Sequence, residues 1–345
     1  MNKLSLVMIV KNEDTVLDRC LSSSKDYVDE IIIVDTGSTD KTLEIAKKYD
    51  AKIFNYEWSD SFSDARNFAI SKSSGDFNLI LDADEYIVKF DRNKINSFMN
   101  NYKNHIGCIK LIDSFEKDNS IQKNISFISR FAPKNTFYEG IIHEQLDPNL
   151  DRIKIPIEIE HDGYLYVNKS DRNIKLILKE LEQNPNNSYM NYQAAKTYYT
   201  NKEYEKASVY FDKYYLNSNY KKDAFYTDSV ILNIYNSVHT KEFDDILKVV
   251  DDNLEILNNR CDFYFACGVL FTEMIAHNPN KYGHFLDNIR ICYENSIRIG
   301  EDDNFDGVVG TGSFLSYYNL SMYYKIMNDL EIENYYLNLY NKTKK

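Results

Sequence analysis

The chain has 345 residues, which is long enough for about two domains with separate hydrophobic cores. Its 53 Asp and Glu residues outnumber 41 Lys and Arg residues, and the net charge of −12 argues against nucleic-acid binding and disfavours an anionic membrane surface. The apolar segment 4–10 is too short for a membrane span, and Lys11 follows it at once, so neither a transmembrane segment nor a signal peptide is expected. The 5 scattered cysteines fit neither a disulfide framework nor a zinc site, which favours a reducing cytoplasm.

Strands and helices are predicted to alternate along the first half of the chain. Short apolar runs that end in polar residues predict strands at 4–10, 31–34, 51–54 and 77–81. The segments between them carry apolar side chains at helical spacing, as in the stripe of Val16, Leu17, Cys20 and Leu21. This alternation predicts an α/β fold with a mostly parallel sheet flanked by helices and with ligands at the carboxyl ends of the strands.

Two carboxylates follow the strand at 77–81, in the segment Asp82-Ala83-Asp84-Glu85. Residues two apart in an extended strand face the same way, so we expect Asp82 and Asp84 to lie together at the strand end. Paired carboxylates suit Mg²⁺ or Mn²⁺, which also take oxygens from substrate phosphates. A solvated acidic turn is the alternative for so short a pattern.

Several segments, taken in order, resemble the family 2 glycosyltransferases, which have the nucleotide-sugar-binding GT-A fold. The matching segments are 8–13, 34–40, 64–67 and 82–85, followed by a group from Arg130-Phe131 through 139–144 to 161–164 that resembles one branch of the family. The resemblance covers residues 1–165. It implies a GT-A domain that uses Mn²⁺ or Mg²⁺ and a nucleoside-diphosphate sugar, with UDP as the expected nucleotide.

The same resemblance implies which residues hold the donor. Val10, Asn12 and Glu13 belong to the first matching segment, and Asp35 is expected to accept a hydrogen bond from the nucleotide base. Arg66 offers a planar guanidinium to the base edge or to the diphosphate. The alternatives are a turn-capping carboxylate for Asp35 and a surface helix arginine for Arg66.

The resemblance also implies the metal ligands and the base. Asp84 is the first choice as ligand, Asp82 is placed near the ribose and the metal, and His161 is either a further ligand or a structural histidine. An inverting transfer needs a general base for the acceptor, and Glu144 is favoured over Glu139 for this role. Whether the favoured residue acts as base or positions the substrate stays open at this point.

The sequence changes character near residue 165, and residues 166–345 are expected to form an all-α domain. Residues 187–216 resemble a tetratricopeptide (TPR) hairpin, with Lys202 near the position of the usual turn glycine. Further helix pairs are expected at 225–257, 263–299 and 313–340, with a loop at 307–312.

These features together predict a metal-dependent, inverting hexosyltransferase. The domain pairing resembles bacterial enzymes that glycosylate Ser, Thr or Cys side chains, and repeat arrays commonly hold extended peptides, so a peptide or protein acceptor is expected. A dimerising role for the helices, with the chain as a homodimer, is the competing view. The alternatives for the whole chain are an enzyme acting on a cell-envelope saccharide and a non-catalytic GT-A/TPR scaffold.

Overall fold

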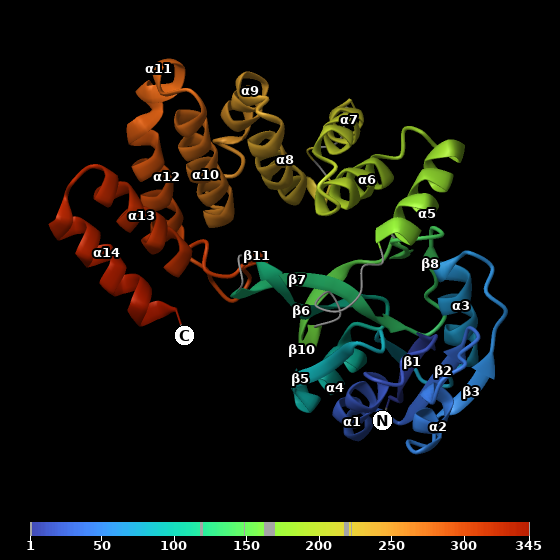
Figure 1. Ribbon diagram of the computed structural model, residues 1–345. Helices are drawn as coiled ribbons and strands as arrows, with labels where there is room; N and C mark the ends of the chain where they lie inside the picture. The colour runs from blue at the N-terminus through green and yellow to red at the C-terminus, as the bar shows by residue number, and fades with distance from the viewer. Residues whose placement is uncertain are drawn as a thin grey trace. The chain divides into compact units, whose positions relative to one another are not determined.

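The computed structural model describes residues 2–117, 120–147, 149–161, 170–216, 221 and 223–344. The chain divides into two compact units, residues 1–169 and residues 170–345. Figure 1 traces both units from the blue N-terminus to the red C-terminus. The expected segment Asp162-Gly163-Tyr164 lies outside the described residues.

The first unit is an α/β domain, as its alternating pattern predicts. Its strands are β1 (Leu4–Val10), β2 (Glu30–Asp35), β3 (Lys52–Asn55), β4 (Phe77–Ile80), β5 (Glu85–Phe90), β6 (Ile106–Lys117), β7 (Ser120–Pro133), β8 (Tyr138–Glu139), β9 (Gln145–Leu146) and β10 (Arg152–His161). Its helices are α1 (Leu17–Ser24), α2 (Thr42–Lys47), α3 (Phe62–Lys72) and α4 (Arg92–Asn101). The main sheet has the order β3-β2-β1-β4-β7-β6-β10-β5, and β8 pairs with β9 in a small separate sheet.

The main sheet is mixed but mostly parallel. Strands β3, β2, β1 and β4 pair in parallel, and so do β6 and β10, whereas β7 is antiparallel to both β4 and β6, and β5 is antiparallel to β10. The side chains of β1 alternate between the two faces of the sheet and are mostly apolar on both, and helices cover both faces. Leu6 and Met8 pack with α1, α2 and α4 on one face, and Val7 packs with α3 on the other.

The long antiparallel pair of β6 and β7 was not predicted. Its side chains are mostly only partly buried, so the apolar runs that indicate buried strands are missing from its sequence. The pair nevertheless matters for the site, because Arg130 lies near the end of β7 and Asp113 lies on β6.

The second unit is a succession of helices, as expected. Its elements are α5 (Ser170–Gln183), α6 (Ser188–Thr200), α7 (Tyr204–Tyr215), α8 (Tyr226–Thr240), α9 (Phe243–Asn253), α10 (Cys261–His277), α11 (Pro279–Tyr282), α12 (Leu286–Ile299), β11 (Gly307–Val308), α13 (Phe314–Ile326) and α14 (Leu330–Thr343). The expected helix pairs are present, and Figure 1 shows their helices stacked side by side. The short helix α11 between α10 and α12 was not predicted.

Three of the helical hairpins turn through a residue with positive φ that is not glycine. Lys202 (φ 62°) follows α6, Lys241 (φ 65°) follows α8, and Asn328 (φ 60°) follows α13. Lys202 therefore takes the left-handed conformation for which a repeat ordinarily uses glycine. Small and aromatic residues close the first hairpin, where Ala195, Ala207 and Phe211 are fully buried.

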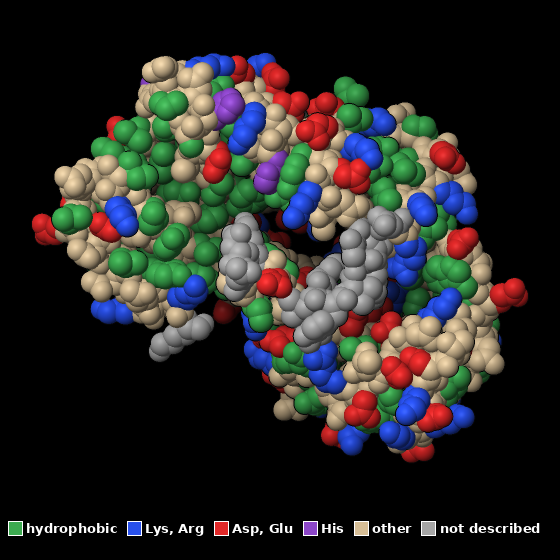
Figure 2. Space-filling view, viewed as in Figure 1, with side chains coloured by type: hydrophobic (Ala, Val, Ile, Leu, Met, Phe, Trp, Pro, Cys, Tyr) green, Lys and Arg blue, Asp and Glu red, His purple; other side chains and the backbone are tan. Residues whose placement is uncertain are grey.

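The surface of the helical unit exposes several large apolar side chains. Figure 2 shows hydrophobic side chains gathered over its helices. The most exposed ones near the C-terminus are Ile326, Leu330 and Tyr335. All 5 cysteines are free thiols. In the described part of the chain, no helix combines the length and apolar character that crossing a membrane requires.

Candidate active site

The carboxyl ends of β1 and β2 are tied together by the residues that follow them. Val10 pairs with Asp35 in the parallel register, so both strands end at the same edge of the sheet. Asn12, at φ 56°, donates its backbone N–H to Ser38 Oγ over 2.9 Å, and its Oδ1 accepts from the backbone N–H of Thr39 at 2.8 Å. These bonds hold the loop after β1 against the loop after β2. Both loops follow the carboxyl ends of parallel strands, where α/β sheets bind ligands.

Two further predicted residues shape the same loops. The Glu13 N–H donates to Thr42 Oγ1 over 2.7 Å. Asp35 is buried, and its carboxylate accepts from the backbone N–H groups of Gly37 and Ser38 at 3.0–3.2 Å. Gly37 has φ 105°, which accounts for glycine at this position. Asp35 therefore caps the turn, the alternative role weighed for it, in addition to lying at the strand end.

Asp82 and Asp84 do not share one face of an extended strand, and the period-two expectation for them is wrong. Strand β4 ends at Ile80, residues 83–84 form a turn, and the backbone N–H of Glu85 donates to Asp82 O over 3.1 Å. Because of this turn, the two carboxylates contact different partners. Asp82 binds arginines, and Asp84 faces His161.

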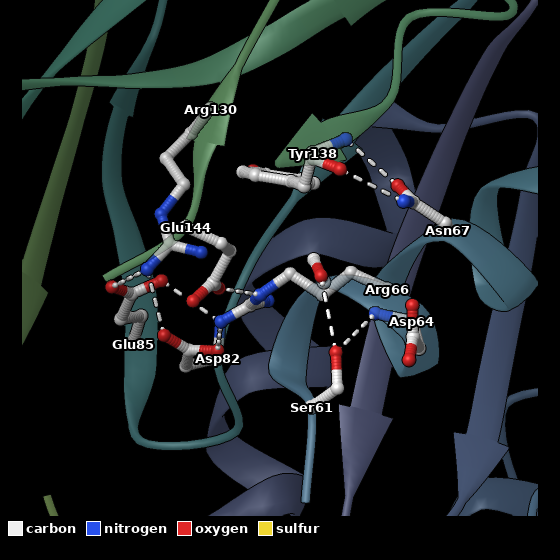
Figure 3. Close-up of polar contacts among 10 residues, drawn as sticks. Ser61, Asp64, Arg66, Asn67, Asp82, Glu85, Arg130, Tyr138 and Glu144 are labelled. Carbon is white, nitrogen blue, oxygen red and sulfur yellow. Dashed lines mark hydrogen bonds and ion pairs between the residues drawn. The ribbon is translucent and has the colours of Figure 1, made fainter. Parts of the chain in front are cut away.

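Asp82 is clamped between two guanidinium groups (Figure 3). Arg66 Nη2 donates to Asp82 Oδ1 and Arg130 Nη2 donates to Asp82 Oδ2, each over 2.7 Å. Burial raises the pKa of Asp82, but the charges of Arg130 and Arg66 outweigh it and hold that pKa well below the usual range. The Asp82 side chain is 32% exposed, so a ligand can still reach the ion-pair cluster.

Glu85 adds a third carboxyl group to this cluster. Its Oε2 accepts from the backbone N–H of Asp82 at 2.8 Å, and its Oε1 lies 3.4 Å from Arg130 Nη2. Burial raises the pKa of the Glu85 carboxyl to about 7, and the nearby charge of Arg130 only partly offsets this effect.

Glu144 joins the cluster, and Glu139 does not. Arg66 Nε donates to Glu144 Oε1 over 2.5 Å, whereas Glu139 is exposed on β8. Tyr138 lies beside the same arginine, with the Arg66 guanidinium 5.7 Å from its ring centroid. Asn67 fixes the Tyr138 backbone by accepting from its N–H at 2.7 Å and donating to its carbonyl oxygen over 2.9 Å.

His161 joins Asp84 to a further carboxylate. Its Nε2 lies 3.3 Å from Asp84 Oδ2, and its Nδ1 lies 2.8 Å from Asp113 Oδ1. Burial lowers the pKa of His161, but hydrogen bonds with Asp113 and Asp84 outweigh it and raise that pKa to about 10. In the described ranges, no group of three or more His, Cys, Asp and Glu side chains is arranged to hold a metal ion.

Asp84 and His161 nevertheless fit a divalent metal that keeps other ligands for a substrate. Two donors about 2.1 Å from a Mg²⁺ ion, at right angles to each other, are about 3 Å apart. The Asp84–His161 separation of 3.3 Å is close to this value. Asp82 is placed differently, because both of its oxygens already accept from arginines.

Arg130, Glu85 and Asp113 take part in the site, although sequence reasoning gave none of them a role. Arg130 and Glu85 lie within segments singled out for the family resemblance, so a signal for them existed. Asp113 lies on an unpredicted strand and had no such signal.

One protein-family model matches most of the first unit. The family model described as glycosyl transferase family 2 matches residues 5–162. A TPR repeat-containing protein of Synechococcus elongatus is 51% identical over 26% of this chain and 22% of its own length. An uncharacterized glycosyltransferase of Rickettsia conorii is 40% identical over 25% of this chain and 30% of its own length. The glycosyltransferase SunS, derived from the SPbeta prophage of Bacillus subtilis, is 29% identical over 49% of this chain and 40% of its own length.

Fold and site define the first unit as an α/β domain with a cluster of carboxylates and arginines near the end of β4. Residues 5–162 of this unit match the model of glycosyl transferase family 2, and a unit of helical hairpins follows them. The matched stretches span only 22–40% of the lengths of these three relatives.

Proposed function

We propose that the protein is a metal-dependent, inverting glycosyltransferase that moves a sugar from a nucleoside-diphosphate sugar, with UDP as the expected nucleotide, to a peptide or protein. The observation that carries this proposal is the Asp84–His161 pair beside the Arg66–Asp82–Arg130 cluster. The proposal is supported because two guanidinium groups and a carboxylate–imidazole pair lie near the end of β4, and α/β sheets bind ligands at strand ends of this kind. The free thiols agree with a cytoplasmic protein.

Asp84 and His161 would hold Mn²⁺ or Mg²⁺, which when bound stabilises negative charge on a departing diphosphate. Arg66 adds to this role. Its Nη1 is buried and has no hydrogen-bond partner within the described residues. A buried guanidinium N–H without a partner is unfavourable, and a phosphate oxygen would satisfy it. The loops around Val10, Asn12, Glu13 and Asp35 would hold the nucleotide.

Glu144 is the proposed base. It lies with Arg66 and Asp82, whereas Glu139 is exposed. A general base must come within hydrogen-bond reach of the acceptor proton. Glu144 is favoured because it contacts Arg66 in the same cluster as Asp82. The ion pair with Arg66 also allows a second role, in which Glu144 positions that arginine.

The helical unit is the reason for proposing a peptide or protein acceptor. Stacked helical hairpins form extended surfaces that commonly bind peptides, and exposed tyrosines of this unit, such as Tyr318 and Tyr335, supply aromatic groups for such contacts. A Ser, Thr or Cys side chain of the bound polypeptide would receive the sugar. A cell-envelope saccharide is the second candidate acceptor, because it needs only the catalytic unit.

A screen of nucleotide sugars tests the proposal. We expect one of them, together with Mn²⁺, to raise the unfolding temperature of the full chain and to be slowly hydrolysed, and a chelator should remove both effects. Asp84→Ala should remove them as well. If no nucleotide sugar stabilises the chain with or without metal, the scaffold alternative becomes the better description.

A further inference from the structure

We infer that Asp113 is a positioning residue that holds the His161 imidazole with Nε2 turned toward Asp84, ready for a divalent cation. The inference rests on the proposed metal site and adds to it a residue that is neither a ligand nor part of the arginine cluster.

Three strands bring these side chains together. Parallel pairing of β10 with β6 sets His161 beside Asp113, and antiparallel pairing of β10 with β5 sets His161 beside Glu85, which directly follows Asp84 in the chain. His161, Asp84 and Asp113 are 14%, 13% and 19% exposed. The arrangement is therefore fixed by the sheet register and largely shielded from water.

The two carboxylates distinguish the ring nitrogens of His161. An ionised carboxylate can only accept a hydrogen bond, so the 2.8 Å contact with Asp113 Oδ1 places a hydrogen on His161 Nδ1. Nε2 lies 3.3 Å from Asp84 Oδ2, and a cation shared with Asp84 would replace the hydrogen of this nitrogen. Carboxylates that hold the far nitrogen of a metal-binding histidine fix its tautomer and orientation in this way.

Asp113 is poorly placed to be a ligand itself. The two ring nitrogens point in different directions, so a cation bound at Nε2 lies away from the carboxylate at Nδ1. This agrees with the lack of any metal-binding group of three such side chains in the described ranges. Asp113 would therefore act on the cation only through His161.

Titration of the full chain with Mn²⁺ in the presence of UDP, followed by electron paramagnetic resonance of free Mn²⁺, tests the inference without using turnover. Asp113→Ala should weaken Mn²⁺ binding about 10- to 100-fold, the usual effect of losing such a partner. Asp113→Glu should restore part of the affinity because it keeps a carboxylate. Glu116→Gln, an exposed position on the same strand, removes the same charge and should bind Mn²⁺ like the wild type.

Thermal unfolding in excess chelator shows whether each variant folds. If Asp113→Ala fails to fold, Asp113→Asn keeps the side-chain volume and should still weaken Mn²⁺ binding. Wild-type affinity in folded Asp113→Ala or Asp113→Asn, together with lost binding in Asp84→Ala, would overturn the inference and leave the proposed function standing. Absence of Mn²⁺ binding to the wild type would instead overturn the metal site and the inference with it.

Discussion

Arg66 and Glu144 are separated by 78 residues in the sequence, yet Arg66 Nε donates to Glu144 Oε1 over 2.5 Å. The two side chains are only 7% and 10% exposed. The other end of the same guanidinium binds Asp82. Glu144 is therefore connected through one arginine to the acidic strand end, and its substitution tests whether it removes a proton or only holds Arg66.

Glu144→Gln should reduce the rate of sugar transfer about 100-fold or more while donor binding is kept. The amide oxygen can still accept from Arg66, but the amide cannot take up the acceptor proton. Single-turnover transfer and calorimetric donor binding measure the two effects separately. The same substitution at exposed Glu139 is the matched control and should leave both unchanged. An equal loss of donor binding in Glu144→Gln would make Glu144 a donor contact.

Asp84→Ala should abolish turnover and leave the fold intact. Asp84 lies in a turn after β4 and contributes little to core packing, so its loss removes a cation ligand without opening a cavity. Circular dichroism checks that the fold is intact, and Mn²⁺-dependent donor hydrolysis checks the loss of turnover. Asp64→Ala, at an exposed position of α3, is the control for removing a carboxylate. Undiminished hydrolysis in Asp84→Ala would exclude Asp84 as an essential ligand.

Arg66→Ala should destabilise the first unit by about 3–5 kcal/mol, because it leaves Asp82 and Glu144 without the cation that both contact. Urea unfolding measures this loss. Lys89→Ala breaks an exposed ion pair with Glu158 in the same sheet and should cost at most about 1 kcal/mol. Similar unfolding free energies for the two variants would mean that the buried cluster does not stabilise the unit.

Acid stability should depend on Glu30. Burial raises the pKa of this carboxyl, but hydrogen bonds from Lys52, Ser5 and Ser74 outweigh it and lower the pKa to about 2 from an ordinary value of 4.5. Because the folded pKa is the lower one, this contribution to stability is complete above about pH 4.5 and is lost as the pH falls toward 2.

Glu30→Gln should accordingly be less stable than the wild type at pH 7, by about 1–2 kcal/mol, the scale for a hydrogen bond to a charged group. The difference should shrink as the pH falls below about 4. Urea midpoints over this pH range measure the effect, with exposed Asp26→Asn as the control. A constant difference at every pH would show that the charge of Glu30 is not responsible.

A chain cut at residue 169 should keep nucleotide-sugar hydrolysis and lose polypeptide glycosylation. The first unit has its own apolar cores on both faces of the sheet, which supports folding without the helices. Hydrolysis assays and mass spectrometry of the polypeptide product compare the two chains. Unchanged Michaelis constants for the native acceptor would exclude the helical unit as its platform and favour an oligomerisation role.

The sequence by itself determined the elements whose pattern is local. Alternating strands and helices, the strand-end position of Asp35 and the hairpin at 187–216 all follow from periodicity and turn residues within short windows. The strand pair β6–β7 escaped prediction because its half-buried residues carry little of that periodicity.

Only the tertiary structure decided which charges meet. Arg66 reaches Glu144 across 78 residues, Arg130 reaches Asp82 across 48, and Asp113 reaches His161 across 48. The two-residue alternation of a strand also gave the wrong placement for Asp82 and Asp84, because residues 83–84 form a turn. Such pairings depend on strand order and register, which arise from packing of the whole sheet, and no short stretch of sequence contains them.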